Sequence, residues 1–239
     1  MASFFQYRAT GAENMDDFSL SGQQLTDTLD DLARVNRWLG GHAIVRSGMK
    51  QIIEQLVLPT PHTLRVADLG CGGGETLRML AAWAQKASIP ILLTGIDANA
   101  ATISYAREAA RDFPEIDYLQ ANAMDESCPF DDYDVVICSL FLHHLEEPEQ
   151  VRLLRNVMQA GVKAILINDL QRSVLAWLLF YPVSRILGLS PLSRHDGALS
   201  VRKSFHRNEL AGLMKKCGIH TFSINWKWAF RYQLIAFIP

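Results

Sequence analysis

The sequence predicts a single α/β domain built on a seven-stranded, mostly parallel β-sheet. Its 239 residues are 49% hydrophobic and 20% charged, which is enough apolar material for one full-sized core. From Leu64 onward, short apolar runs alternate with amphipathic segments, a pattern typical of βα units in a parallel sheet. The last two apolar runs follow each other closely enough to form an antiparallel hairpin at the end of the chain.

Two helices are expected before the first strand. Ser21 and Gln24 have the spacing of a capping box, and leucines then recur at helical intervals, which predicts a helix over 22–38. A pair of glycines interrupts this pattern. A second apolar stripe over 45–56 predicts another helix, which should end before Pro59.

The βα repeats supply five expected strands. Val66–Leu69 is expected to be a buried strand, followed by a glycine-rich loop and a helix. Pro148 is well placed in a first helical turn, and Gly161 can terminate the helix that it opens. The other expected strands lie at 91–96, 116–119, 133–140 and 164–167, with a further helix at 100–111.

After the fifth strand the repeat changes, which indicates an insertion. Residues 174–189 form a strongly apolar helical stretch, and the polar residues 190–204 that follow are turn-prone. A helix near 209–217 and strands at 222–226 and 232–238 complete the chain. We therefore expect one domain with four parts: an N-terminal helical cap (1–60), a core (62–170), an apolar cap insertion (171–204), and a C-terminal helix and hairpin (205–239).

The composition excludes several classes of site. A formal net charge of −2 argues against a nucleic-acid partner, because phosphate backbones are bound by clustered Lys and Arg. The four cysteines include no C-x-x-C pair, so we expect no metal site and no disulfides, and a cytoplasmic location. The apolar run 174–189 contains Pro182 and Arg185 and falls short of the roughly 20 residues that a membrane-spanning helix needs.

A glycine-rich turn follows the first strand. Asp68-Leu69-Gly70-Cys71-Gly72-Gly73-Gly74 links a buried strand to a helix, and glycine lets the backbone approach a ligand closely because it lacks Cβ and tolerates positive φ. The second strand ends at Asp97, and an acid at a strand tip can accept hydrogen bonds from both ribose hydroxyls of a nucleoside. Together these features predict a nucleoside-cofactor site.

Over residues 62–170 the chain resembles the class I S-adenosylmethionine (SAM) dependent methyltransferases, whose first motif is an acid, one residue and Gly-x-Gly-x-Gly. The resemblance implies a Rossmann-like methyltransferase fold with SAM as cofactor. In it, Asp68 would orient the ammonium group of SAM and Asp97 would hold the ribose. Asn122 stands where the family often carries an acid facing adenine, so Asn122 or Asp125 would supply that contact. The expected cofactor-binding residues are Asp68, Gly70, Cys71, Gly72, Gly74, Asp97, Ala98, Asn122, Ala123 and Ser139.

A nicotinamide cofactor is the alternative, because glycine-rich loops of the two classes look alike. Glu75 occupies the position at which the dinucleotide fingerprint has Gly or Ala. Its carboxylate would also face a pyrophosphate near the helix N-terminus, which is unfavourable for two anions. The loop therefore favours SAM over NAD.

Two histidine-containing segments are candidates for the acceptor site. His143 and His144 follow the fourth strand, at the sheet edge where open α/β folds bind ligands, and either could act as a general base. Packing against the cofactor is the alternative role for this pair.

The second candidate lies in the polar stretch after the apolar helix. His195 and Asp196 offer a base and its orienting acid, and Arg194 and Arg202 offer donors for an anionic group. A solvated loop would explain the same composition. The catalytic candidates are thus His143, His144, His195 and Asp196.

Three other residues carry structural expectations. Asp169 and Arg172 come just after the fifth strand, on the edge of the sheet that holds the glycine loop, and we expect a structural salt link there. Trp38, between the two N-terminal helices, is expected in the core.

The apolar stretch sits where the resembling family inserts substrate-binding caps. A pocket needs an apolar lining with a few polar groups, so Trp177, Phe180, Tyr181, Arg194 and Arg202 are the expected acceptor-binding residues. Ordinary core packing and reversible membrane contact are the alternatives for this helix.

A looser resemblance extends to bacterial methyltransferases of natural-product and polyketide tailoring, through Met15-Asp16-Asp17, the 35–41 segment and His195-Asp196-Gly197. It implies methyl transfer from SAM to a small, largely apolar acceptor. We expect O-methylation of a phenolic or lipidic metabolite. C-methylation of a quinone-type lipid, and a non-catalytic SAM-binding regulatory subunit, are the alternatives.

Overall fold

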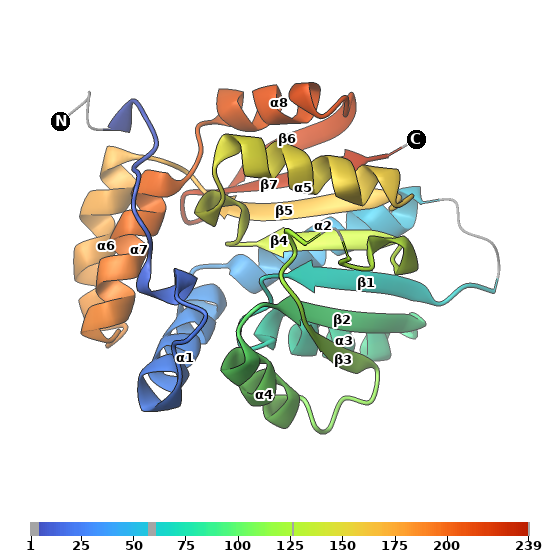
Figure 1. The fold of residues 1–239 in the computed structure, drawn as a ribbon, viewed down its shortest axis with the longest axis horizontal. Helices are drawn as coiled ribbons and strands as arrows, with labels where there is room; N and C mark the ends of the chain where they lie inside the picture. Colours follow the sequence, from blue (N-terminus) through green and yellow to red (C-terminus); the bar gives the residue numbers. More distant parts are fainter. Residues whose placement is uncertain (1–4, 57–60, 126, 239) are drawn as a thin grey trace.

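The computed structural model describes residues 5–56, 61–125 and 127–238 and confirms the predicted fold class (Figure 1). Within these residues seven strands form one sheet in the order β3-β2-β1-β4-β5-β7-β6. The first five strands are parallel, and β7 runs antiparallel to both β5 and β6, as the predicted hairpin requires. The strands are β1 (Leu64–Leu69), β2 (Ile91–Asp97), β3 (Ile116–Gln120), β4 (Val135–Ser139), β5 (Ala164–Leu170), β6 (Thr221–Lys227) and β7 (Arg231–Phe237).

Helices cover both faces of the sheet because successive residues of a buried strand point to opposite sides. Val66 packs with residues of α2, α3 and α4, whereas its neighbour Ala67 packs with residues of α5 and α8. The helices are α1 (Gly22–Trp38), α2 (Gly41–Gln55), α3 (Glu75–Ala87), α4 (Ala100–Ala109), α5 (Glu147–Gln159), α6 (Val174–Ile186), α7 (Pro191–Lys203) and α8 (Arg207–Lys216), with short 3-10 turns η2 (Asn14–Asp16), η3 (Phe130–Asp132) and η4 (Leu142–His144).

The strand order reverses between β1 and β4, and this switch point positions the site. In open α/β sheets the crevice beyond the carboxyl ends of such strands is where ligands bind. Figure 1 shows α1, α6 and α7 grouped beyond these carboxyl ends, away from the layers that cover the two faces of the sheet. The three helices therefore form a wall opposite the strand tips.

The polar stretch 190–204 is a helix, α7, and the expectation of a turn-rich segment was wrong. Its start follows ordinary rules: Ser190 caps the helix by accepting a hydrogen bond from the Ser193 N–H, and Pro191 occupies the first turn. The helix has no apolar stripe because its buried face is largely polar. That face includes Ser193, Asp196, Ser200 and Lys203.

Several local expectations also need correction. Ser21 stands at the N-cap of α1 but makes no side-chain capping hydrogen bond, so the capping box is absent. Trp38 is 68% exposed at the end of α1, outside the core. Strand β5 extends to Leu170 and therefore contains Asp169. The expected end of the second helix before Pro59 is confirmed, since α2 ends at Gln55; Pro59 itself lies outside the described residues.

Helix α6 ends at Ile186 and contains Pro182 within its length. No helix among the described residues is long and apolar enough to cross a bilayer.

Candidate active site

The glycine loop and Asp97 are tied together at the tips of β1 and β2. Gly72 has φ +52°, a left-handed conformation that favours glycine, and its N–H donates to Oδ2 of Asp97 at 3.1 Å. Oδ1 of Asp97 accepts from the Asn99 N–H at 3.0 Å. At Gly70 an added Cβ would lie 2.3 Å from the Phe141 ring, so no larger residue fits there. The loop is thus held in one shape under the cavity.

Asp68 is a buried acid without a matching donor. One oxygen, Oδ1, has no hydrogen-bond partner in the described part of the chain. Burial, and then the negative charges of Glu75 and Asp97, raise the pKa of Asp68 well above its ordinary value. A cationic ammonium group beside this carboxyl would favour its ionised form and so oppose both effects. The site therefore fits the amino-acid portion of SAM, which carries such a group.

A cavity of about 750 Å³ opens above these residues. Its floor is formed by the strand tips and its walls by α1, the 11–18 segment, η4, α6, α7 and the 228–231 turn. Of the predicted cofactor-binding residues, it is lined by Asp68, Gly70, Cys71, Gly72, Asp97, Ala98, Asn122, Ala123 and Ser139. Gly74 does not line it, because this residue packs against Tyr118, whose hydroxyl oxygen would lie 2.1 Å from an added Cβ.

The structure separates the two candidates for the adenine contact. Asn122 lines the cavity, and its Oδ1 accepts from the Met124 N–H at 2.9 Å, which leaves its amide nitrogen for a ligand. Asp125 is not among the lining residues, so Asn122 is the better placed of the two.

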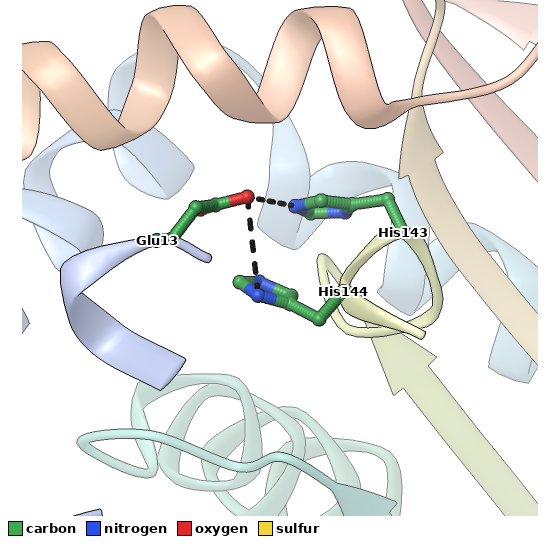
Figure 2. Close-up of side chains that lie close together, drawn as sticks. All are labelled: Glu13, His143 and His144. Carbon is green, nitrogen blue, oxygen red and sulfur yellow. Dashed lines mark ion pairs between the residues drawn. The ribbon is translucent and has the colours of Figure 1, made fainter. Parts of the chain in front are cut away.

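The two histidines after β4 belong to a polar cluster on one wall of the cavity. Nδ1 of His143 lies 2.7 Å from Oδ1 of Asp169, and the His143 backbone N–H donates to Oδ2 of the same carboxylate at 3.2 Å. Nδ1 of His144 lies 2.6 Å from Oδ1 of Asp16. The rings of His143 and His144 lie 4.3 Å apart between their centroids. Oε1 of Glu13 faces both rings from one side (Figure 2).

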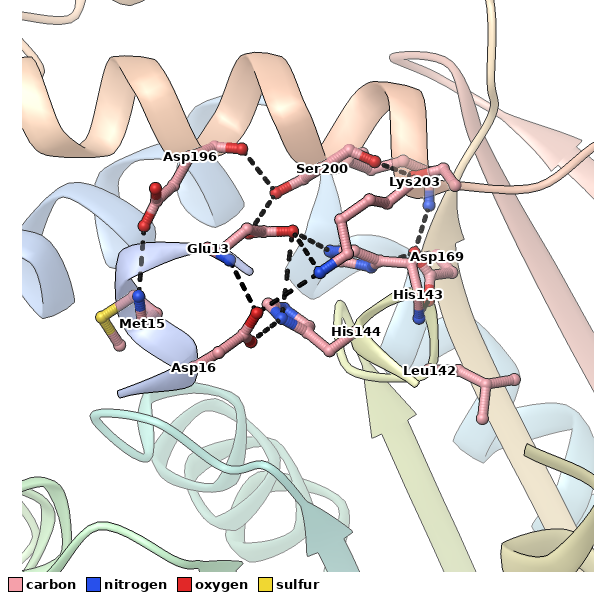
Figure 3. A network of polar contacts seen from close by, with 12 residues as sticks. Glu13, Met15, Asp16, Leu142, His143, His144, Asp169, Asp196, Ser200 and Lys203 are labelled. Atoms are coloured by element: carbon pink, nitrogen blue, oxygen red, sulfur yellow. Dashed lines mark hydrogen bonds and ion pairs between the residues drawn. The ribbon is translucent and has the colours of Figure 1, made fainter. Parts of the chain in front are cut away.

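Glu13 and Asp16 are site residues that the sequence reasoning missed. Figure 3 shows how they are held: Oε2 of Glu13 accepts from the Ser200 hydroxyl at 2.7 Å, and Lys203 Nζ lies 3.4 Å from an oxygen of each acid. Asp196 holds the same segment by accepting from the Met15 N–H at 3.2 Å and from the amide of Asn14. The Met15-Asp16-Asp17 motif was a sequence signal for this segment, but it suggested no partner.

Within the cluster, the electrostatics favour the ionised forms of His144 and Asp16. Burial alone would raise the pKa of Asp16, but the hydrogen bond and charge of His144 lower it to about 2. Burial alone would lower the pKa of His144, but Asp16 and Glu13 raise it above its ordinary value. Burial likewise opposes the ionised form of Asp169, and His143 holds the pKa of that carboxyl below its usual range.

His195 lies apart from this cluster. Its Nδ1 is 3.2 Å from Oδ1 of Asp196, but its side chain is 69% exposed. Asp196 lines the main cavity, whereas His195 lines a separate, shallower hollow. Of the predicted acceptor-binding residues, Phe180 lines the main cavity, and the hollow beside His195 is lined by Trp177, Tyr181, Arg194 and Arg202.

The expected salt link between Asp169 and Arg172 is absent. Asp169 is engaged with His143, and Arg172 instead pairs with Glu209 at 2.5 Å. Arg172 is buried, and its guanidinium also donates to the backbone oxygens of Phe5 and other residues, so it fastens the start of the described chain.

The sequence pattern of the family described as "Methyltransferase domain" matches residues 66–161. The ubiquinone biosynthesis O-methyltransferase of Pseudomonas aeruginosa is 30% identical over 165 residues, which cover 67% of this chain and 66% of that protein. The enzyme of the same name from Rickettsia conorii is 32% identical over 137 residues, or 56% of this chain and 44% of that protein. The aligned part of the chain thus spans between 44% and 66% of these relatives.

Solved structures share the fold at low sequence identity. Human N-acetylserotonin methyltransferase in complex with SAM has a TM-score of 0.64 at 14% identity, covering 95% of this chain and 63% of that one. The CMeT domain of the citrinin polyketide synthase has a TM-score of 0.63 at 14% identity, covering 82% and 52%. Together with the matched domain and the loop geometry, these similarities show that the chain belongs to the class I SAM-dependent methyltransferases, whose cofactor is S-adenosylmethionine.

Proposed function

We propose that the protein transfers the methyl group of SAM to an oxygen atom of a small, largely apolar acceptor. One observation carries this proposal: the same cavity is lined by the glycine loop, by the histidine cluster and by apolar side chains of α1 and α6. Cofactor, acceptor and a proton-accepting group can therefore meet in one enclosed space.

The apolar walls select the acceptor. On the α6 side the lining includes Ala176, Leu179, Phe180 and Val183, and on the α1 side Leu32, Val35 and Leu39. Such a lining with a few convergent polar groups is typical of small-molecule pockets. A phenol or lipid with an apolar body would bury that body here and keep its hydroxyl at the histidine cluster.

SAM, when bound, supplies a methyl group on a sulfonium, a leaving group already activated by its positive charge. The residues of the chain then have two tasks, which are alignment and removal of the acceptor proton. We infer that Asp68 holds the amino-acid portion of the cofactor and that Asp97 holds its ribose. An acceptor phenol has an ordinary pKa near 10, so a group that takes its proton at neutral pH accelerates attack.

The histidine cluster is placed for that second task. Because Asp169 can only accept hydrogen bonds when ionised, it keeps a proton on Nδ1 of His143 and leaves the lone pair of Nε2 directed toward Glu13. The cluster therefore offers a proton-accepting position on a cavity wall, close to the tip of β4.

The named relatives support an oxygen acceptor. The two sequence relatives described above are O-methyltransferases of ubiquinone biosynthesis by name, which favours a phenolic ring with an apolar tail. C-methylation of a quinone-type lipid is the second candidate, and the fold similarity to a polyketide synthase CMeT domain favours it. A non-catalytic SAM-binding subunit is the third.

The decisive experiment is methyl transfer to a panel of catechols and phenols with alkyl tails of increasing length, followed by mass spectrometry and NMR of the products. We expect a methoxy product and a KM that falls as the tail lengthens. A methyl group on ring carbon would identify the C-methyltransferase. SAM binding without turnover of any phenol, quinol or enol acceptor would favour the regulatory subunit.

We also propose that α6 makes reversible contact with a membrane that holds such an apolar acceptor. Leu175, Leu178 and Ile186 are 54%, 48% and 84% exposed on this helix, and Arg185 lies beside Ile186. An exposed apolar face with an adjacent cation favours anionic lipid. In sedimentation assays, vesicles containing phosphatidylserine should carry more of the protein into the pellet than neutral vesicles do. Equal amounts of protein in the two pellets would contradict the proposal.

A further inference from the structure

We propose that Glu13, His143 and His144 form a binding site for one divalent transition-metal ion, with Zn²⁺ as the natural probe. Oε1 of Glu13 lies 3.7 Å from Nε2 of His143 and 3.9 Å from Nδ1 of His144, and the three atoms all lie within 4.8 Å of one another (Figure 2). The site is on the wall of the main cavity, to which all three residues contribute.

Two of the three ligand atoms are buried without a hydrogen-bond partner among the described residues. These atoms are Oε1 of Glu13 and Nε2 of His143. The third, Nδ1 of His144, lies 2.6 Å from Oδ1 of Asp16, so it must lose the proton that it shares with this carboxylate before it can bind a metal ion. Because Asp169 fixes the proton of His143 on Nδ1, Nε2 presents a lone pair to a carboxylate oxygen. Two buried acceptors that face each other are unfavourable unless a proton or a cation lies between them, and at 3.7 Å they are too far apart to share a proton well.

The spacing suits a metal ion. In a tetrahedral zinc site with bonds of about 2.0 to 2.1 Å, neighbouring ligand atoms lie about 3.3 Å apart, so the observed distances need a contraction of only a few tenths of an ångström around Glu13. Asp169 supplies the outer contact that metal-bound histidines usually have, a carboxylate on the opposite ring nitrogen. The ring of His143 is therefore already oriented as a ligand.

The charges leave room for a cation. Three carboxylates, those of Glu13, Asp16 and Asp169, lie in the cluster, and the single charges of Lys203 and of a protonated His144 do not neutralise all three. Figure 3 shows the Lys203 side chain reaching from α7 to both Glu13 and Asp16. A divalent cation held by Glu13 and by two neutral imidazoles would, together with Lys203, balance these three charges.

The ligand types select the metal. Two imidazoles and one carboxylate suit Zn²⁺, Fe²⁺, Co²⁺ or Ni²⁺, whereas Mg²⁺ and Ca²⁺ prefer oxygen ligands alone. Three protein ligands leave at least one coordination position open to the cavity. If the proposed methyl transfer holds, His143 would then act as a metal ligand in place of a base, and an acceptor hydroxyl bound to the ion would lose its proton to water more readily, because a metal ion lowers the pKa of a bound hydroxyl.

Metal binding can be measured without SAM or acceptor. The chelator-treated protein should bind one Zn²⁺ per chain in calorimetry, and Co²⁺ should give the visible absorption bands of a low-coordinate site. Glu13→Gln and His144→Asn should each weaken Zn²⁺ binding by more than about 100-fold, and Asp169→Asn by about 10-fold to 100-fold.

The matched control is His62→Asn. His62 also pairs with a carboxylate, Asp134, at 2.7 Å, but it lies outside the cavity, so its replacement should leave Zn²⁺ affinity unchanged. SAM affinity of each variant, measured in parallel, reports that the chain is folded. Absence of stoichiometric Zn²⁺ binding by the wild type, or equal affinity in Glu13→Gln, His144→Asn and the control, would overturn the proposal. Failure to methylate any acceptor would leave this result unaffected.

Discussion

His143 and Asp169 form a buried pair in which Nδ1 of the ring lies 2.7 Å from a carboxylate oxygen, with both side chains at most 2% exposed. Asp169 belongs to β5, and His143 follows the adjacent strand β4, so the register of two parallel strands sets the orientation of the ring. The pair therefore positions Nε2 in the cavity more firmly than a loop residue could.

Replacing this acid should impair catalysis while sparing the cofactor site. Asp169→Asn removes the charge that fixes the ring tautomer, so we expect kcat for a phenolic acceptor to fall by about 10-fold to 100-fold with SAM affinity near wild type. Activity should recover as pH approaches the pKa of the phenol, because the ionised acceptor needs no base. A loss of kcat that is the same at every pH would indicate a purely structural role.

Asp97 should contribute directly to SAM affinity. Asp97→Ala removes charge-assisted hydrogen bonds to the ribose, and we expect binding to weaken by about 1 to 3 kcal/mol in calorimetry. Asp125→Ala is the matched control, since Asp125 lies close in sequence to Asn122 but does not line the cavity. Equal effects of both substitutions, or binding of NAD by the wild type, would contradict the assignment.

Binding of SAM should release protons from Asp68. Its pKa is raised in the free protein, first by burial, and an ammonium group beside it would lower that pKa again. Protons are therefore released on binding below the free-state pKa, and affinity rises with pH until that pKa is passed. Calorimetry in two buffers of different ionisation enthalpy measures the release, which Asp68→Asn should reduce; net proton uptake would contradict the prediction.

The parts of the fold that depend on neighbouring residues could be predicted from the sequence. The turn from Asp68 to Gly74 was identifiable because its glycines, its strand and its helix are adjacent. The sequence does not predict helix α7, because this helix lacks apolar periodicity and buries Asp196, Ser200 and Lys203 in polar contacts with the N-terminal segment.

The composition of the histidine cluster could not be predicted, for a different reason. Asp16 lies 128 positions from His144 in the sequence. The two residues meet only because the 11–18 segment lines the cavity beside α7. Local pattern carries no information about such a contact. The histidines themselves were identifiable because they directly follow a strand at the switch-point edge.

The ion pair between His144 and Asp16 should make stability depend on pH. The raised pKa of His144 gives stability that is present below pH 6.5 and lost as pH rises through the folded-state value. The pKa of Asp16, lowered from 3.8 to about 2, gives stability that is present above pH 3.8 and lost as pH falls toward 2.

The contribution of the pair is thus greatest between about pH 4 and 6. Asp16→Asn should lower the free energy of unfolding more at pH 5 than at pH 9, as measured by urea denaturation, with residual loss at pH 9 from its contact with Lys203. A larger effect at pH 9 would show that Lys203 is the dominant partner. The exposed pair Arg111 and Glu108 is a suitable control, since its removal should change little at either pH.

The cap can be tested by two aromatic residues of α6 that face different hollows. Phe180 lines the main cavity, so Phe180→Ala should raise the KM of an apolar acceptor several-fold with SAM affinity near wild type, because acceptor and cofactor contact different walls. Trp177 instead packs edge-on against Phe5 and Tyr181, at ring distances of 6.0 and 5.0 Å, so Trp177→Ala should cost about 1 to 3 kcal/mol of stability and leave KM unchanged. Gly197→Ala on α7 gives an independent check, since an added Cβ would lie 2.3 Å from the Phe180 ring and must displace it. Steady-state kinetics and thermal denaturation of the three variants decide the matter: a KM raised by Trp177→Ala but not by Phe180→Ala would move the acceptor to the shallower hollow beside His195.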